Sequence, residues 1–446
     1  MMFRRTLLTA AVAAAAWLSV LPAAAEVFNP KTFTLDNGMQ VVVISNHRAP
    51  IVTQMVWYKV GSADEPRGKS GIAHFVEHLM FKATKNLESG EFSRTVARNG
   101  GRDNGFTSYD YTGYHQSVAA DRLGIVMQLE ADRMRNLIID PGEVEPERLV
   151  VLEERRSRTD NSPGAKLFEQ MNAALYLNYP YRDPIIGWEH EIRRITVEDL
   201  RAFYDKWYWP NNAVLVVAGD VTVDQVRPLA EKYYGVIPRG PGIKRERTAE
   251  PPHNAARRVI LRDRRVRQPS VRKRYMAPSH GYGDKRHIYA LQVLSEIIGS
   301  NTGVLSKSLV RERKIAVSAG AFYRSDGIGP RAFTYYASPA PGVSMEKLEA
   351  ALQVEIDKLL KSGVTAEEVA RAKSRMSASA IYARDSAGRG ARVLGAALAT
   401  GQTIEDVESW PERIEAVTLE QINEAARAVM IERNSVTGLL LAKRPS

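Results

Sequence analysis

From about residue 32 onward the chain shows short alternating runs of apolar and polar residues, and longer helical patterns follow them. The segment 32–45 alternates like a β-hairpin, with Asn37-Gly38 as its tight turn. Strand character returns at 51–60 and at 105–119. Helical spacing marks four further stretches, at 70–83, 89–99, 121–136 and 144–159. Strands followed by helices predict an α+β fold, in which a mostly antiparallel sheet carries helices packed on one face.

The second part of the chain repeats the pattern of the first. The segment 195–200 resembles the segment 417–422, so that Thr196 corresponds to Thr418. Each Thr is followed at the same spacing by an Asn, Asn212 or Asn434, and then by an apolar strand pattern. The offset between the two copies is far too long for a solenoid repeat, so it predicts two homologous domains.

A stretch rich in proline and charge, from Pro238 to Pro252, divides the two copies. We therefore expect an N-terminal domain over 26–237, a linker over 238–256 and a C-terminal homologous domain over 257–446.

The first residues have the features of a secretory signal. A basic pair, Arg4 and Arg5, precedes an apolar run over 7–21, and small residues at 23–25 offer a cleavage site. A membrane anchor is the weaker interpretation, because the run is shorter than the roughly 20 residues that span a bilayer. We expect a signal peptide over 1–25, a periplasmic or secreted mature protein, and no contact with the membrane after cleavage.

Composition narrows the chemistry. The chain has no cysteine, so disulfides and thiolate metal sites are excluded, and any metal must be held by His and carboxylate groups. The formal charge of +11 falls to +9 (11 − 2) without Arg4 and Arg5. The most basic stretch, 257–274, is interrupted by apolar residues in strand fashion. It indicates a solvated strand face, and we expect no nucleic-acid partner.

The segment His74-Phe75-Val76-Glu77-His78 carries the sharpest chemical signal. On a helix, residues four apart lie on the same face, so His74 and His78 can bind one ion. Glu77 lies close to that face and can serve as the base that activates an attacking water. Zinc suits this set, because it accepts nitrogen and oxygen ligands and keeps an open position for water.

A third protein ligand is needed, and the helical stretch 147–154 offers three acidic residues. Glu147 and Glu154 are two helical turns apart and share one helix face, and Glu153 is a further candidate. The alternative is a charged solvent face paired with the basic residues Arg148, Arg155 and Arg156. The residues alone leave these interpretations open.

The combined motifs resemble the insulinase/pitrilysin family of zinc peptidases. His-x-x-Glu-His is followed, at the spacing typical of that family, by the last Glu of Glu-Arg-x-Val-x-Leu-x-Glu. The resemblance implies one zinc ion per chain, held by His74, His78 and Glu154, with Glu147 as a second acidic residue near the metal. It implies the short two-domain type of chain, as in the subunits of mitochondrial processing peptidase.

The segment 99–108 resembles that family's glycine-rich turn and edge strand. In this resemblance a substrate peptide docks along Asn104, Gly105, Phe106 and Thr107. An exposed strand edge binds an extended peptide through backbone hydrogen bonds, which agrees with this role. An ordinary hairpin turn is the alternative.

One family element is missing. Active members share an Arg and a Tyr at a fixed spacing in the domain that faces the zinc site. Here the matching positions hold Val310 and Val317, and a shift by one position gives Arg311 with Ser318. The second copy also has Ser374 where Glu154 has its counterpart. We therefore expect a homologous partner subunit to supply the pair in a heterodimer. The alternatives are a homodimer, which would lack the pair, and a chain in which other residues do the same work.

The predicted function is zinc-dependent endopeptidase activity on short or unfolded peptides, with Glu77 as the base. The alternative is a non-catalytic peptide-binding or scaffold subunit of a peptidase complex. The intact Glu77 argues against this alternative, because a pure binder needs no base beside two metal ligands.

Overall fold

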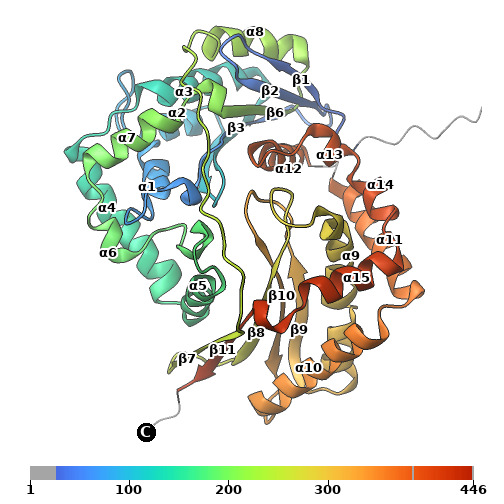
Figure 1. Ribbon diagram of the computed structural model, residues 1–446. Coiled ribbons are helices and arrows are strands. Elements are labelled where there is room, and N and C mark those ends of the chain that lie inside the picture. Colours follow the sequence, from blue (N-terminus) through green and yellow to red (C-terminus); the bar gives the residue numbers. More distant parts are fainter. Residues whose placement is uncertain (1–26, 384–385, 444–446) are drawn as a thin grey trace, which may run out of the picture.

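A computed structural model describes residues 27–383 and 386–443, so the predicted signal peptide over 1–25 lies outside the described residues. The described chain forms two α+β halves that face each other (Figure 1). The first half holds the strands β1 (Lys31–Thr34), β2 (Gln40–Ser45), β3 (Ile51–Tyr58), β4 (Arg102–Thr107), β5 (Thr112–Ala119) and β6 (Ala213–Gly219). Its helices are α1 (Ile72–Leu79), α2 (Glu91–Arg98), α3 (Leu123–Asn136), α4 (Pro141–Arg155), α5 (Pro163–Leu175), α6 (Glu189–Ile192), α7 (Val197–Trp207) and α8 (Val223–Tyr233).

The second half follows a stretch, 238–256, that contains neither helix nor strand. Its strands are β7 (Arg257–Asp263), β8 (Ser270–Ala277), β9 (Ala316–Tyr323), β10 (Arg331–Pro339) and β11 (Ser435–Ala442). Its helices are α9 (Ile288–Gly299), α10 (Met345–Ser362), α11 (Ala366–Ala383), α12 (Ala387–Ala399), α13 (Ile404–Glu408), α14 (Trp410–Glu415) and α15 (Leu419–Val429). Short 3₁₀ and π turns join several elements, among them a π turn over 156–160 that extends α4.

The two sheets confirm the predicted pair of homologous, mostly antiparallel domains. The first sheet has the order β1-β2-β6-β3-β5-β4 and the second β7-β11-β8-β10-β9. Each contains a single parallel pair among the described strands, β2 with β6 and β7 with β11. Apart from the extra strand β1, the order and directions therefore match strand for strand. The repeated threonines, Thr196 and Thr418, each begin a helix with a capping box, which explains their recurrence in the sequence.

Local differences from the predicted elements have clear causes. The strand character over 105–119 belongs to two strands, β4 and β5, joined by a tight connection at 108–111. The predicted helix over 70–83 is shorter, because α1 starts after Gly71, whose φ is 91°. A Cβ at Gly71 would lie 2.6 Å from the carbonyl oxygen of Ile186, so glycine is required there.

Each sheet is covered on one face by helices of its own half and on the other by a helix of the opposite half. Helix α12 lies across β3 and β6 of the first sheet, and α5 lies across β7 and β11 of the second (Figure 1). The separation of these helices along the chain is close to that of Thr196 and Thr418, so the two halves exchange equivalent helices. The predicted domain limits stay predictions. Helix α5 precedes the predicted limit at 237 but packs on the second sheet.

Apolar side chains account for this exchange. On α12, Leu394 is fully buried in a cluster with Trp57 of β3 and Val216 of β6. On α5, Met171 is fully buried with Val436 of β11. Burial of a large apolar side chain contributes roughly 1.5–3 kcal/mol, so both helices are held firmly.

Candidate metal centre

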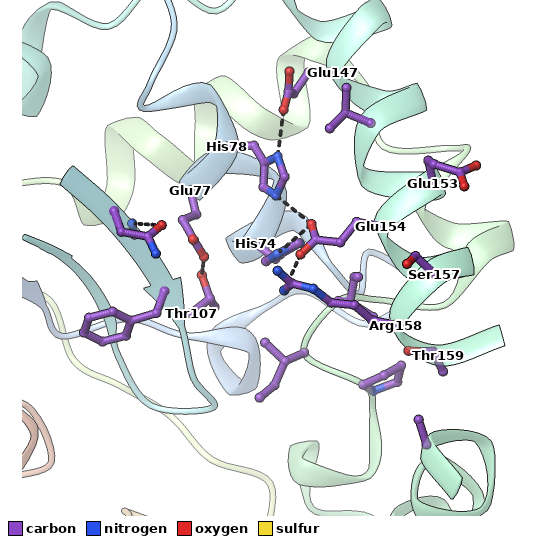
Figure 2. A pocket seen from close by; sticks show the side chains of 18 of the residues that line it. His74, Glu77, His78, Thr107, Glu147, Glu153, Glu154, Ser157, Arg158 and Thr159 are labelled. Carbon is purple, nitrogen blue, oxygen red and sulfur yellow. Dashed lines mark hydrogen bonds and ion pairs between the residues drawn. The ribbon is translucent and has the colours of Figure 1, made fainter. Parts of the chain in front are cut away.

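A large cavity, of about 1370 Å³, lies beside α1 (Figure 2). Its walls are formed by α1, β4, the outer face of α4 with its π turn, and one side of α5. The residues that line it fall between His74 and Ile186, so the second half of the described chain adds none.

Helix α1 fixes the motif residues rigidly. Phe75, Val76 and Leu79 are fully buried, so they anchor one side of the helix in the first core. His74 and Glu77 are also buried, with exposed fractions of 7% and 8%, yet both border the cavity. The apolar anchors therefore leave the polar side chains of α1 little freedom to move.

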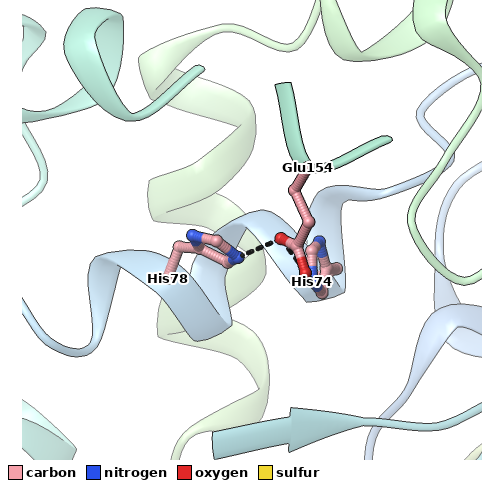
Figure 3. A group of neighbouring side chains, drawn as sticks. All are labelled: His74, His78 and Glu154. Carbon is pink, nitrogen blue, oxygen red and sulfur yellow. Dashed lines mark hydrogen bonds and ion pairs between the residues drawn. The ribbon is translucent and has the colours of Figure 1, made fainter. Parts of the chain in front are cut away.

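The structure brings His74, His78 and Glu154 together (Figure 3). Oε2 of Glu154 lies 2.9 Å from Nε2 of His78 and 3.6 Å from Nε2 of His74. One potential ligand atom from each residue lies within 4.8 Å of the others. Two ring nitrogens and a carboxylate oxygen that converge in this way are the donor set of a catalytic zinc site.

Buried His74 supports the fit to a metal ion. Its Nδ1 is buried and has no hydrogen-bond partner among the described residues. Its Nε2 points toward Glu154 but remains beyond hydrogen-bond distance. Burial lowers the pKa of His74 to about 4, so the ring is neutral and can offer a lone pair. A metal ion placed between these residues would accept the lone pair of Nε2, the nitrogen that faces Glu154.

Glu147 orients His78 from behind. Its Oε1 lies 2.7 Å from Nδ1 of His78, and its Oε2 lies 2.5 Å from Nζ of Lys82. Burial opposes protonation of His78, but the hydrogen bonds to Glu147 and Glu154 outweigh it and raise the pKa to about 9. Glu147 and Glu154 therefore favour positive charge at His78, which a metal ion would also provide. Glu147 in addition fixes the orientation of the His78 ring.

The ion pairs of the basic residues on α4 show which of its acidic residues belong to a charged solvent face. Arg148 pairs with Glu145, Arg155 with Glu169 and Arg156 with Glu153. None of these ion pairs involves Glu147 or Glu154. The solvent-face interpretation therefore applies to Glu153, whose side chain is 62% exposed, and not to the two residues beside the histidines.

Glu77 lies beside the ligand cluster and is held by β4. The hydroxyl of Thr107 donates a hydrogen bond of 2.5 Å to its Oε2. A Cβ at Gly105 would lie 3.0 Å from Cγ and Oε1 of Glu77, so the strand approaches closely because this residue is glycine. Burial raises the pKa of Glu77, against the opposing effect of the Thr107 hydrogen bond.

The four residues predicted to contact substrate divide between the two faces of β4. Gly105 and Thr107 adjoin Glu77. The Phe106 ring packs edge-on against Trp57, with ring centroids 5.0 Å apart, on the side covered by α12. The side-chain oxygen of Asn104 accepts a hydrogen bond from the Gly105 amide. All four border the cavity, and β4 is the last strand of its sheet.

Two basic residues at the site are not predicted by the sequence motifs. Lys82 contacts Glu147. Arg158 on the π turn contacts Glu154 (Figure 2). Each lies one helical turn after a predicted site residue, Lys82 after His78 and Arg158 after Glu154. That helical spacing is the signal that could have identified them.

Comparison with known proteins identifies the family. The profile described as insulinase (peptidase family M16) matches residues 40–188, and the profile of the peptidase M16 inactive domain matches 194–376. Zinc protease PqqE of Helicobacter pylori is 33% identical over 354 residues, which cover 78% of this chain and 79% of that protein. The chain belongs to peptidase family M16.

Solved structures of M16-like proteins agree with the fold. The crystal structure of a protease from Helicobacter pylori has a TM-score of 0.86 at 30% identity, and the match covers 93% of this chain and 99% of that one. The periplasmic protease PqqL from Escherichia coli matches with a TM-score of 0.79 at 21% identity. That match covers 92% of this M16 chain but only 47% of PqqL.

The positions that would hold the family's Arg and Tyr lie elsewhere in the second half. Val310 packs against the second core, and Val317 on β9 is 49% exposed. Arg311 donates a hydrogen bond to the backbone oxygen of Asn301. None of the three lines the cavity beside α1.

Across 27–383 and 386–443, no helix is both long and apolar enough to span a bilayer.

Proposed function

We propose that this M16 chain is a zinc-dependent endopeptidase that cleaves short or unfolded polypeptides. The observation that carries the proposal is the convergence of His74, His78 and Glu154 beside Glu77 in one open cavity. Zinc held by these three ligands would lower the pKa of a water molecule toward about 7 and polarise the scissile carbonyl.

The residues of the chain then handle the proton. Glu77 takes a proton from the attacking water and later passes it to the leaving amine. Its raised pKa suits a group that must first accept and then release a proton. Thr107 holds Oε2 of Glu77, which leaves Oε1 available for the water.

The substrate would add to the free edge of β4. Among the described strands β4 pairs with β5 alone, so the backbone groups of its outer edge can bind an extended peptide. Gly105 keeps that edge free of a Cβ beside Glu77, so a bound backbone can approach the base closely. Recognition through the backbone favours short or unfolded chains over folded proteins.

A homologous partner subunit would complete the site. The cavity is lined by first-half residues, and valines stand where an Arg and a Tyr would complete the family pattern. The match to 47% of PqqL is consistent with this proposal, because that longer chain has room for a second such unit. The partner would supply a cation and a hydroxyl to the substrate carbonyl, and a homodimer would lack them.

We propose a periplasmic or secreted location on the strength of the signal-like segment over 1–25. PqqL, a periplasmic protease of similar fold, fits this location.

A non-catalytic, peptide-binding subunit is the second candidate. The match of 194–376 to a profile described as an inactive domain favours it. The position of Glu77, held by Thr107 beside the ligand cluster, favours the peptidase instead.

The test is cleavage of a mixed pool of unstructured peptides by the purified protein, with Glu77→Gln as the control. Cleavage by the wild type alone establishes a peptidase that needs no partner. Cleavage that appears only with a homologous subunit bearing the Arg and Tyr establishes the shared site. A zinc-loaded protein that cleaves nothing in either case would leave the binding subunit as the function.

A further inference from the structure

Arg158 contacts Glu154, one of the proposed metal ligands. No sequence motif assigns a role to this arginine. It lies on the π turn that continues α4, and its guanidinium contacts Oε1 of Glu154 (Figure 2). The side chain is 72% exposed and borders the cavity. π turns within helices are rare and often occur at functional sites, because they redirect side chains.

The two carboxylate oxygens of Glu154 have separate partners. Oε2 faces Nε2 of His78 at 2.9 Å and Nε2 of His74 at 3.6 Å. Oε1 has no ion pair with either histidine among the described residues and meets Arg158. A guanidinium that occupies Oε1 leaves a single oxygen to join the two ring nitrogens.

We propose that Arg158 is a positioning residue that makes Glu154 a one-oxygen ligand. This inference rests on the proposed zinc site. With Oε1 held, the carboxylate cannot bind a metal ion through both oxygens, and a coordination position stays free for water. Hydrogen bonds to ligating carboxylates commonly fix their orientation in this way.

The neighbouring pair of Arg156 and Glu153 provides a matched control. Its N–O distance is 2.8 Å, and both side chains are largely exposed, at 61% and 62%. Glu154, in contrast, is 15% exposed. Screening by water makes the first pair weak, whereas the sheltered carboxylate of Glu154 can be oriented by its arginine.

The experiment compares the purified full chain with its Arg158→Met, Arg158→Lys and Arg156→Met variants. Zinc affinity is measured by competition with a chelator, and the Co²⁺ form is measured by visible absorption. Four-coordinate Co²⁺ absorbs more strongly than five-coordinate Co²⁺, so the spectrum reports whether Glu154 binds through one oxygen or two. Neither measurement requires activity or a partner subunit.

We expect Arg158→Met to bind zinc about 10–100-fold more weakly and to lose intensity in the Co²⁺ band. Removal of the positive charge of Arg158 would by itself strengthen zinc binding. This effect is smaller than the loss of orientation, because water screens the exposed guanidinium. Arg158→Lys should restore most of the band, and Arg156→Met should match the wild type. An Arg158→Met spectrum and affinity equal to those of the wild type would overturn the inference alone. A wild type that binds neither metal would overturn the proposed zinc site as well.

Discussion

His78 and Glu147 are joined through the ring nitrogen that faces away from the ligand cluster. Oε1 of Glu147 lies 2.7 Å from Nδ1 of His78, while Nε2 of the same ring faces Glu154. A carboxylate behind a metal-binding histidine fixes the ring and its tautomer. Glu147 therefore acts on the proposed metal through His78.

Replacement of Glu147 by Gln should weaken zinc binding by about 10–100-fold, since the ring of His78 loses its charged partner. Chelator competition on the purified protein measures the change. Glu153→Gln is the control, because Glu153 is exposed and pairs with Arg156. Equal losses in both variants would show that helix charge, and not orientation of His78, controls affinity.

Replacement of Glu77 by Gln should reduce peptide cleavage by at least about 10²-fold, because the base for the attacking water is lost. Zinc content should remain that of the wild type, since Glu77 is outside the ligand cluster. Activity and metal content are measured on the same preparation. Loss of zinc in this variant would mean that Glu77 itself is a ligand.

Thr107→Val should lower the turnover of peptides by about 10-fold, because Glu77 loses the hydroxyl that holds its Oε2. Thr107→Ser keeps the hydroxyl and should restore most of the rate. The comparison is made from kcat and KM on one peptide. If Val and Ser variants behave alike, the methyl group and not the hydrogen bond is what matters at this position.

Gly105→Ala should also impair cleavage, because its Cβ would lie 3.0 Å from Cγ and Oε1 of Glu77. The carboxylate must then shift from its place beside the ligands. Gly164→Ala is the control, since no heavy atom lies within 4 Å of a Cβ built there. Cleavage at the wild-type rate by Gly105→Ala would contradict the close approach of β4 to the base.

The exchange of helices between halves predicts different effects for two glycines of α12. A Cβ at Gly395 would lie 2.1 Å from the indole ring of Trp57, whereas a Cβ at Gly388 meets nothing within 4 Å. Gly395→Ala should lower the free energy of unfolding by about 1–3 kcal/mol. Gly388→Ala should leave it unchanged or raise it by up to about 1 kcal/mol through helix propensity. Denaturant unfolding checks both, and equal values would argue that α12 does not pack on β3.

Much of the site could be predicted from the sequence because its signals are local. His74, Glu77 and His78 lie within two turns of one helix, so their spacing alone places them together. The domain repeat was equally visible, because Thr196 and Thr418 are helix caps whose role depends on close neighbours in the sequence. The choice among the acidic residues of α4 was not local, and the residues alone left it open.

The sequence by itself determined the α+β class, the repeat and the His-x-x-Glu-His face, since each depends on periodicity and short-range hydrogen bonds. Tertiary structure decided which carboxylate meets which partner: Glu147 behind His78, Glu154 between the histidines and Arg158, and Glu153 in solvent. It also decided that α5 and α12 cross to the opposite sheets. Those outcomes depend on which apolar faces bury each other across the whole chain, and no local pattern encodes that pairing.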